Sequence, residues 1–132
     1  MQWVFNRKVE KDHGDGGLTV GAKLTADTRV VILDDVITAG TSARESIAIM
    51  KDHGDPTIVG MMISVDRMER GMGETSAPQE IGNQFGVEVQ SIVSAREVIE
   101  LIHGREIDGK IPLGDSEKQK MEAYLKEYAP RA

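Results

Sequence analysis

One thirteen-residue string, VVILDDVITAGTS from Val30 to Ser42, constrains the fold more than any other part of the chain. Its first four residues are aliphatic, which predicts a strand buried on both faces, as in parallel sheets. Asp34 and Asp35 follow at the carboxyl end of that strand, where open α/β sheets bind their ligands. Small residues and hydroxyls then lead into a helix expected from Ala43 to Asp52. The string therefore predicts a strand, a ligand-binding turn and a helix in direct succession.

The turn from Thr38 to Ser42 has the composition of an anion site. Small residues let successive backbone N–H groups converge, and the start of a helix adds a partial positive charge, so a terminal phosphate suits it. The two neighbouring carboxylates suit sugar hydroxyls and a magnesium ion. The turn is not a Walker A loop, because the chain has no G-x-x-x-x-G-K-[ST] pattern. The alternative is a plain capped turn, in which Asp34 and Asp35 act only as caps.

Strands and helices alternate through the rest of the chain. Further strands are expected at Thr57–Ser64, at Trp3–Phe5 and at Val87–Val93, whose alternating pattern places it nearer a sheet edge. Four S-x-x-[EQ] patterns predict capping boxes at helix starts, namely those beginning at Ser42, Ser76, Ser94 and Ser116. Two charged, glycine-rich stretches, Arg7–Gly17 and Asp66–Ala77, are expected to be functional loops without regular structure. The order predicts one α/β domain over residues 1–132, with a mostly parallel sheet flanked by helices.

Composition excludes several classes of protein and site. The chain has no cysteine, so disulfides, thiolate zinc sites and a cysteine nucleophile are ruled out, and a reducing cytoplasm suits it. Its net charge of −6 argues against nucleic-acid or anionic-membrane partners. No apolar run is long enough for a membrane span. The three histidines, His13, His53 and His103, lack metal-ligand spacing, so no protein-held metal is expected.

The string from Val30 to Ser42 resembles the phosphoribosyl-pyrophosphate (PRPP) signature of the type I phosphoribosyltransferases, and all thirteen positions are compatible with it. The resemblance implies that family's α/β fold. It also implies a PRPP site made by nine consecutive residues: Asp34, Asp35, Val36, Ile37, Thr38, Ala39, Gly40, Thr41 and Ser42.

The segment FNRKVEKDHGDGG, from Phe5 to Gly17, resembles the mobile catalytic loop of orotate phosphoribosyltransferases. The resemblance implies that Arg7, Lys8, Lys11 and His13 bind the pyrophosphate of PRPP, with Lys11 and His13 as the catalytic residues. Cations so close together suit a pyrophosphate. On composition alone, a solvated charged hairpin is the alternative.

A third match is ISVDRMERG, from Ile63 to Gly71. The resemblance implies that Arg67 and Thr38 face the carboxylated pyrimidine, orotate. The alternative is a surface arginine paired with Asp66 or Glu69.

Together the three matches imply an enzyme of pyrimidine synthesis, which converts orotate and PRPP into orotidine 5′-monophosphate and pyrophosphate. They also imply Mg²⁺ as cofactor, a cytoplasmic location, and a homodimer whose catalytic loop acts in the neighbouring subunit. Family members carry a substantial portion before this loop, so the fold is expected to lack that N-terminal part. Two alternatives stay open: a non-catalytic module that binds PRPP or a nucleotide, and a fragment of such an enzyme that is inactive alone.

Overall fold

The structure is a computed structural model that describes residues 2–11 and 17–131. Strands and helices follow one another in the order expected for an α/β chain. Their bounds are β1 Val4–Lys11, β2 Gly17–Gly21, β3 Arg29–Val36, α1 Thr41–Asp52, β4 Thr57–Asp66, α2 Ala77–Phe85, β5 Val89–Ser94, α3 Ala95–Ile102 and α4 Asp115–Tyr128.

Strands β3, β4 and β5 form a three-stranded parallel sheet with β4 in the middle. Ile32 on β3 pairs with Met61 on β4, which in turn pairs with Val89 on β5. This confirms the prediction of a parallel sheet and the position of β5 at its edge. Because the strands run in parallel, their carboxyl ends share one edge, and the β3–α1 turn lies there.

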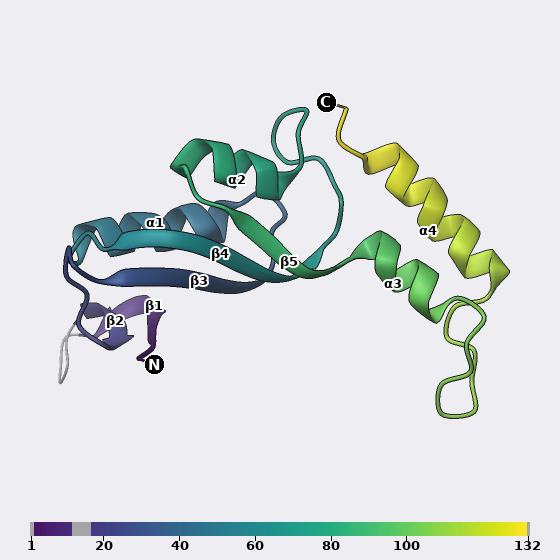
Figure 1. Ribbon diagram of the computed structural model, residues 1–132, viewed down its shortest axis with the longest axis horizontal. Coiled ribbons are helices and arrows are strands. Elements are labelled where there is room, and N and C mark those ends of the chain that lie inside the picture. The colour runs from purple at the N-terminus through teal and green to yellow at the C-terminus, as the bar shows by residue number, and fades with distance from the viewer. Residues whose placement is uncertain (1, 12–16, 132) are drawn as a thin grey trace.

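Helices α1 and α2 cover one face of this sheet (Figure 1). The core between them is aliphatic, and its most deeply buried large side chains are Ile47, Ile63 and Ile81. Ile37 and Ala43 also belong to this cluster, so the turn that joins β3 to α1 is anchored in the core at both ends.

The other face of the sheet is open among the described residues, so the prediction that β3 is buried on both faces is wrong. Val31 and Leu33 on β3 are 54% and 76% exposed, and Ile92 on β5 is 75% exposed. Side chains alternate between the faces of a strand, so these residues point away from α1 and α2. A continuous aliphatic run shows that both faces are apolar, but it does not show whether a second layer covers them.

Strands β1 and β2 pair as an antiparallel hairpin in a separate sheet, with Phe5 opposite Val20. The short strand expected at Trp3–Phe5 is thus part of a longer one. The expectation that Arg7–Gly17 has no regular structure is wrong for Arg7 to Lys11, which lie in β1, and for Gly17, the first residue of β2. His13 lies outside the described residues.

Two of the four predicted capping boxes are confirmed. Ser76 with Gln79 opens α2, and Ser94 with Glu97 opens α3. The boxes predicted at Ser42 and Ser116 are wrong, because both serines lie inside their helices. The N-caps of α1 and α4 are the glycines Gly40 and Gly114, and neither helix has a side-chain cap.

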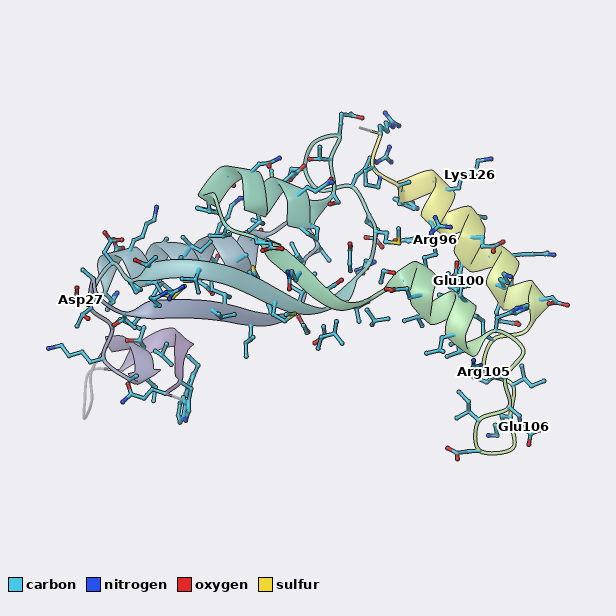
Figure 2. All side chains as sticks on the ribbon, in the orientation of Figure 1. Asp27, Arg96, Glu100, Arg105, Glu106 and Lys126 are labelled. Atoms are coloured by element: carbon cyan, nitrogen blue, oxygen red, sulfur yellow. The ribbon has the colours of Figure 1, made fainter. Side chains whose placement is uncertain are left out.

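Helices α3 and α4 form an arm that extends beyond the carboxyl edge of the sheet. Figure 2 labels Asp27 at the amino end of β3 and, on the far side of the molecule, Arg96 and Glu100 on α3. The end of α4 meets the segment after β4, where the Tyr128 carbonyl accepts the backbone N–H of Arg70 at 2.9 Å. No helix among the described residues is long and apolar enough to cross a membrane.

Candidate functional site

The turn between β3 and α1 surrounds a cavity of about 180 Å³ at the carboxyl edge of the sheet. This volume is below the range of about 300–1,000 Å³ typical of drug-sized ligands and suits a single anionic group. The residues that line it are Asp34, Val36, Ile37, Thr38, Gly40, Thr41, Ser42 and Ala43. The structure thus brings together seven of the nine residues from Asp34 to Ser42 that were predicted to bind PRPP.

Helix α1 begins at this cavity without a side-chain cap. The first backbone N–H groups of a helix have no partner within the helix, and its N-terminus carries a partial positive charge. Here the first intrahelical bond runs from the Arg44 N–H to the Gly40 carbonyl at 3.0 Å. The N–H groups before Arg44 are therefore placed to bind an anion. The anion would occupy the position that the oxygen of a capping side chain has in other helices.

Gly40 occupies a position that requires glycine for two reasons. Its φ of +73° is in the left-handed region, which costs other residues about 1–2 kcal/mol. A Cβ at this position would also lie 2.8 Å from Arg44 Nη1 and 2.8 Å from Ile81 Cδ1. The turn between β3 and α1 is therefore packed directly against the core through Gly40.

The two neighbouring aspartates take different positions. Asp34 lines the cavity and accepts a hydrogen bond from the Ser42 hydroxyl at 3.3 Å. Asp35 is exposed, does not line the cavity, and accepts from the backbone N–H of Val36 at 2.7 Å. Successive side chains of a strand point to opposite faces, which accounts for the separation. The Ser42 hydroxyl, predicted to cap the helix, instead binds the Asp34 carboxylate.

Arg67, predicted to face orotate, lies at a second cavity of about 400 Å³. None of the residues that line the first cavity, beside Asp34, lines this one. Its Nη2 is 2.7 Å from Glu69 Oε1, and its Nε donates to the same oxygen at 2.9 Å. Tyr124 on α4 also donates to Glu69 Oε1, at 2.9 Å, and this hydrogen bond raises the pKa of Tyr124. The structure therefore shows the ion pair with Glu69 that was the alternative for Arg67.

The backbone places Arg7, Lys8 and Lys11 on β1. Figure 1 shows the β1–β2 hairpin beside the amino-terminal half of β3, whereas the cavity follows the carboxyl end of that strand. An eight-residue strand is roughly 26 Å long. Within one chain, the hairpin and the cavity are therefore well separated.

Two charged residues beside the cavity were not among the predicted site residues. Arg44 in α1 donates from Nη1 to the Ala39 carbonyl at 2.5 Å, and from Nε to Gln84 Oε1 at 2.8 Å. Glu80 in α2 accepts from the backbone N–H groups of Gly73 and Met72, at 2.6 and 3.0 Å. No sequence pattern points to this pair, because Arg44 in α1 and its partners in α2 are about 40 residues apart in the chain.

The pKa of Glu80 is lowered, chiefly by the hydrogen bond from Gly73, next by that from Met72, and to a smaller extent by the charge of Arg44. A carboxylate whose pKa is lowered in the folded state stabilises that state at pH values above the ordinary pKa of about 4.3. This contribution disappears as the pH falls through the lowered pKa. We therefore expect Glu80→Gln to reduce the free energy of unfolding at pH 7, and to reduce it less at pH 3, where the pH has fallen towards the lowered pKa of Glu80. Urea unfolding at both pH values measures it.

The control for this prediction is Glu100→Gln, which changes an exposed carboxylate on α3. A Glu80→Gln effect of equal size at both pH values would contradict the assignment to the charged form of Glu80.

The oxygen donors beside the cavity decide whether the predicted Mg²⁺ fits there. Magnesium is usually held by one or two carboxylates together with substrate phosphates. Asp34 supplies such a carboxylate at the cavity, and each of its oxygens retains a second lone pair after its hydrogen bond to Asp35 N–H or to Ser42. Among the described residues, no three His, Asp or Glu side chains gather to hold a metal ion. The donors present fit an ion carried mainly by substrate oxygens.

No protein-family profile matches the chain. Curated orotate phosphoribosyltransferases are similar to it: that of Lachnoclostridium phytofermentans is 42% identical over 132 residues, and that of Clostridium acetobutylicum is 46% identical over 126 residues. These alignments cover 100% and 96% of the chain, but 59% and 56% of the relatives. The chain thus spans little more than half the length of these relatives.

Solved structures agree with this similarity. The crystal structure of orotate phosphoribosyltransferase from Francisella tularensis matches with a TM-score of 0.71 and 28% identity, over 98% of this chain and 56% of that one. Leishmania donovani UMP synthase matches with a TM-score of 0.69 over 96% of this chain and 24% of that one, and at 20% identity it shows a shared fold alone. The predicted phosphoribosyltransferase fold, present only in part, is confirmed.

Proposed function

We propose that the chain belongs to the orotate phosphoribosyltransferase family and carries the PRPP-binding part of an enzyme that transfers phosphoribosyl to orotate. The products are orotidine 5′-monophosphate and pyrophosphate, and the reaction belongs to pyrimidine synthesis. We place it in the cytoplasm, with which a cysteine-free sequence is compatible.

The observation that carries the proposal is the uncapped start of α1 at the 180 Å³ cavity. In this assignment, the N–H groups and hydroxyls of Thr38 to Ser42 bind the 5′-phosphate, as helix N-termini bind anions elsewhere. Gly40 gives the turn its left-handed residue, and Ile37 and Ala43 fix both its ends in the core.

The remaining groups of PRPP fall to residues on both sides of this turn. Asp34 and Asp35 are assigned to the ribose hydroxyls, and Mg²⁺ bound to the pyrophosphate would neutralise part of its charge. Lys11, with Arg7, Lys8 and His13, is assigned to the pyrophosphate. Negative charge grows on this leaving group as its bond to C1 of the ribose breaks and the bond from C1 to orotate forms, so fixed cations there stabilise the transition state more than the ground state.

Orotate is assigned to Thr38 and Arg67. The contacts of Arg67 with Glu69 and Tyr124 use its Nε and Nη2 atoms. A guanidinium has five N–H donors, so Nη1 is still suited to a carboxylate of the substrate. The ion pair with Glu69 would then orient the arginine instead of competing with orotate.

We further propose a homodimer in which the β1–β2 hairpin serves the partner's cavity. Figure 1 shows the hairpin beside the amino half of β3, whereas the residues that line the cavity follow the carboxyl end of that strand, and this separation supports the arrangement.

Subunit mixing tests the action across the dimer. It uses a chimera in which the portion of the Clostridium acetobutylicum relative outside the alignment is fused to this chain. We expect Lys11→Ala to lower kcat about 30-fold, equivalent to the roughly 2 kcal/mol of one charge-assisted hydrogen bond. Mixing it with an Asp34→Asn/Asp35→Asn chimera should restore partial activity, because each mixed dimer has one intact site. Absence of recovery after proven subunit exchange would place Lys11 in its own chain's site.

The chimera also tests the reaction itself. PRPP-dependent loss of orotate absorbance, measured beside the intact relative, is the expected result. A chimera that binds PRPP but leaves orotate unchanged would contradict the proposal and favour the binding-module alternative.

A further inference from the structure

Arg44 connects the turn between β3 and α1 to helix α2. Its guanidinium donates to the Ala39 carbonyl at 2.5 Å and to Gln84 at 2.8 Å, and its Nη2 is 4.0 Å from Glu80 Oε2. The Arg44 and Glu80 side chains are only 28% and 16% exposed. Arg44 thus forms hydrogen bonds with the backbone of the turn and with Gln84 of the neighbouring helix, and a longer ion pair with Glu80 of that helix.

We propose that Arg44 and Glu80 are positioning residues for the phosphate site, an inference that rests on the function proposed above. Arg44 holds the peptide between Ala39 and Gly40 in the orientation that binds phosphate. Glu80 holds Arg44 and, through the same carboxylate, the backbone after β4. Neither residue lines the cavity, so their effect on the ligand passes through the backbone.

The geometry of one peptide bond explains the role of Arg44. In a trans peptide the C=O and the N–H point in opposite directions. A hydrogen bond that draws the Ala39 carbonyl towards Arg44 therefore directs the Gly40 N–H away from Arg44. Gly40 lines the cavity and has a left-handed conformation, in which glycine rotates readily. Without Arg44, this peptide has a lower barrier to turning its N–H away from the ligand.

Glu80 extends the network to the loop between β4 and α2. Its two oxygens accept the N–H groups of Gly73 and Met72. A Cβ on Gly71 would lie 2.4 Å from Glu80 Oε2, so the loop backbone closes tightly around this carboxylate. The loop follows directly after Arg67, the residue assigned to orotate. Glu80 therefore connects the loop that begins at Arg67, the proposed orotate residue, through Arg44 to the turn proposed to bind phosphate.

Two substitutions separate positioning from simple charge attraction. Lysine at position 44 would keep the positive charge but lose the planar fork that reaches Ala39 and Gln84 together. If Arg44 acted only through its charge, Arg44→Lys would bind phosphate as well as the parent chain. If it acts by orienting the peptide, Arg44→Lys and Arg44→Met should both weaken binding.

The experiment uses the 132-residue chain labelled with ¹⁵N, titrated with ribose 5-phosphate. We expect Arg44→Met to raise the Kd about tenfold and Arg44→Lys at least fivefold, with the thermal unfolding temperature close to that of the parent. We expect Glu80→Gln to raise the Kd about threefold and to shift the Met72 and Gly73 amides. Arg96→Met, which removes an exposed arginine from α3, should change neither the Kd nor the Met72 and Gly73 amides.

The ligand-free spectra make the inference independent of the proposed function. In Arg44→Met and Arg44→Lys, the Gly40 amide should shift and exchange with solvent faster, even if no chain binds ribose 5-phosphate. Failure of the parent chain to bind would count against the phosphate site alone. An unchanged Gly40 amide in a folded Arg44→Lys chain would overturn the positioning role, as would a Kd equal to that of a parent that does bind.

Discussion

Replacement of Gly40 by alanine should weaken ribose 5-phosphate binding by about 30-fold or more, equivalent to about 2 kcal/mol. The left-handed conformation at φ +73° costs an alanine about 1–2 kcal/mol. Its Cβ would also press against Ile81, which is fully buried, and overpacking a core costs about 1–3 kcal/mol more. The turn should escape both costs by changing conformation, which moves its N–H groups away from the phosphate.

A matched control separates these two costs. Gly104 has a φ of +69°, but nothing lies within 4 Å of the place where its Cβ would be. Gly104→Ala should therefore carry the conformational cost alone and leave ligand binding unchanged. Isothermal titration calorimetry of both variants gives the comparison, and a folded Gly40→Ala chain with the parent's affinity would contradict the account of the turn.

The second large effect is expected from Asp34→Asn/Asp35→Asn in the chimera. Asparagine keeps the shape of both side chains and removes their charge, so the fold should persist. PRPP-dependent kcat/KM should fall about 100-fold or more, because two charge-assisted hydrogen bonds to ribose would be lost, each worth about 1.5–3 kcal/mol. Steady-state kinetics at varied PRPP concentration measure this loss.

The two single variants, Asp34→Asn and Asp35→Asn, should differ in their effects. Asp34 lines the cavity and Asp35 does not, so Asp34→Asn should have the larger effect on binding of the 5′-phosphate end of the ligand. Asp27→Asn, an exposed change at the amino end of β3, is the control. Wild-type kcat/KM in the double variant would falsify the role assigned to the two carboxylates.

Local patterns predicted the elements well because neighbours in sequence decide them. The capping boxes at Ser76 and Ser94 formed as expected, since each needs only a serine and the side chain three residues later. The same pattern at Ser42 and Ser116 failed. In both places a glycine takes the N-cap position, and at Ser42 the hydroxyl has another partner in Asp34. At Ser42, the contact with Asp34 competes with the capping role of the hydroxyl.

Non-local features were harder to predict. The aliphatic run of β3 gave its strand and its carboxyl-end turn, but not the exposure of Val31 and Leu33. The charged stretch after Phe5 was expected to be irregular, yet backbone pairing with β2 makes its first part a strand. Pairing between segments and coverage of a face depend on other parts of the chain, which a local pattern does not contain.

The candidate site shows the same division. Residues from Asp34 to Ser42 were identified together because the motif that predicts them is contiguous, and most of them line one cavity. Arg44 and Glu80 carried no such signal, because their contacts join α1, α2 and the loop after β4. The ion pair of Arg67 was foreseen only as an alternative, and its contact with Tyr124, 57 residues away, had no sequence counterpart.

The most direct test of the central claim, that the turn from Thr38 to Ser42 binds a 5′-phosphate, is a titration of the ¹⁵N-labelled chain with ribose 5-phosphate, followed by nuclear magnetic resonance. Ribose without phosphate serves as the control and should leave the spectrum unchanged. We expect saturable shifts of the Thr38, Gly40 and Thr41 amides, because these residues line the cavity. Shifts confined to other regions, such as the second cavity at Tyr124, or no shifts at saturating ribose 5-phosphate, would contradict the claim.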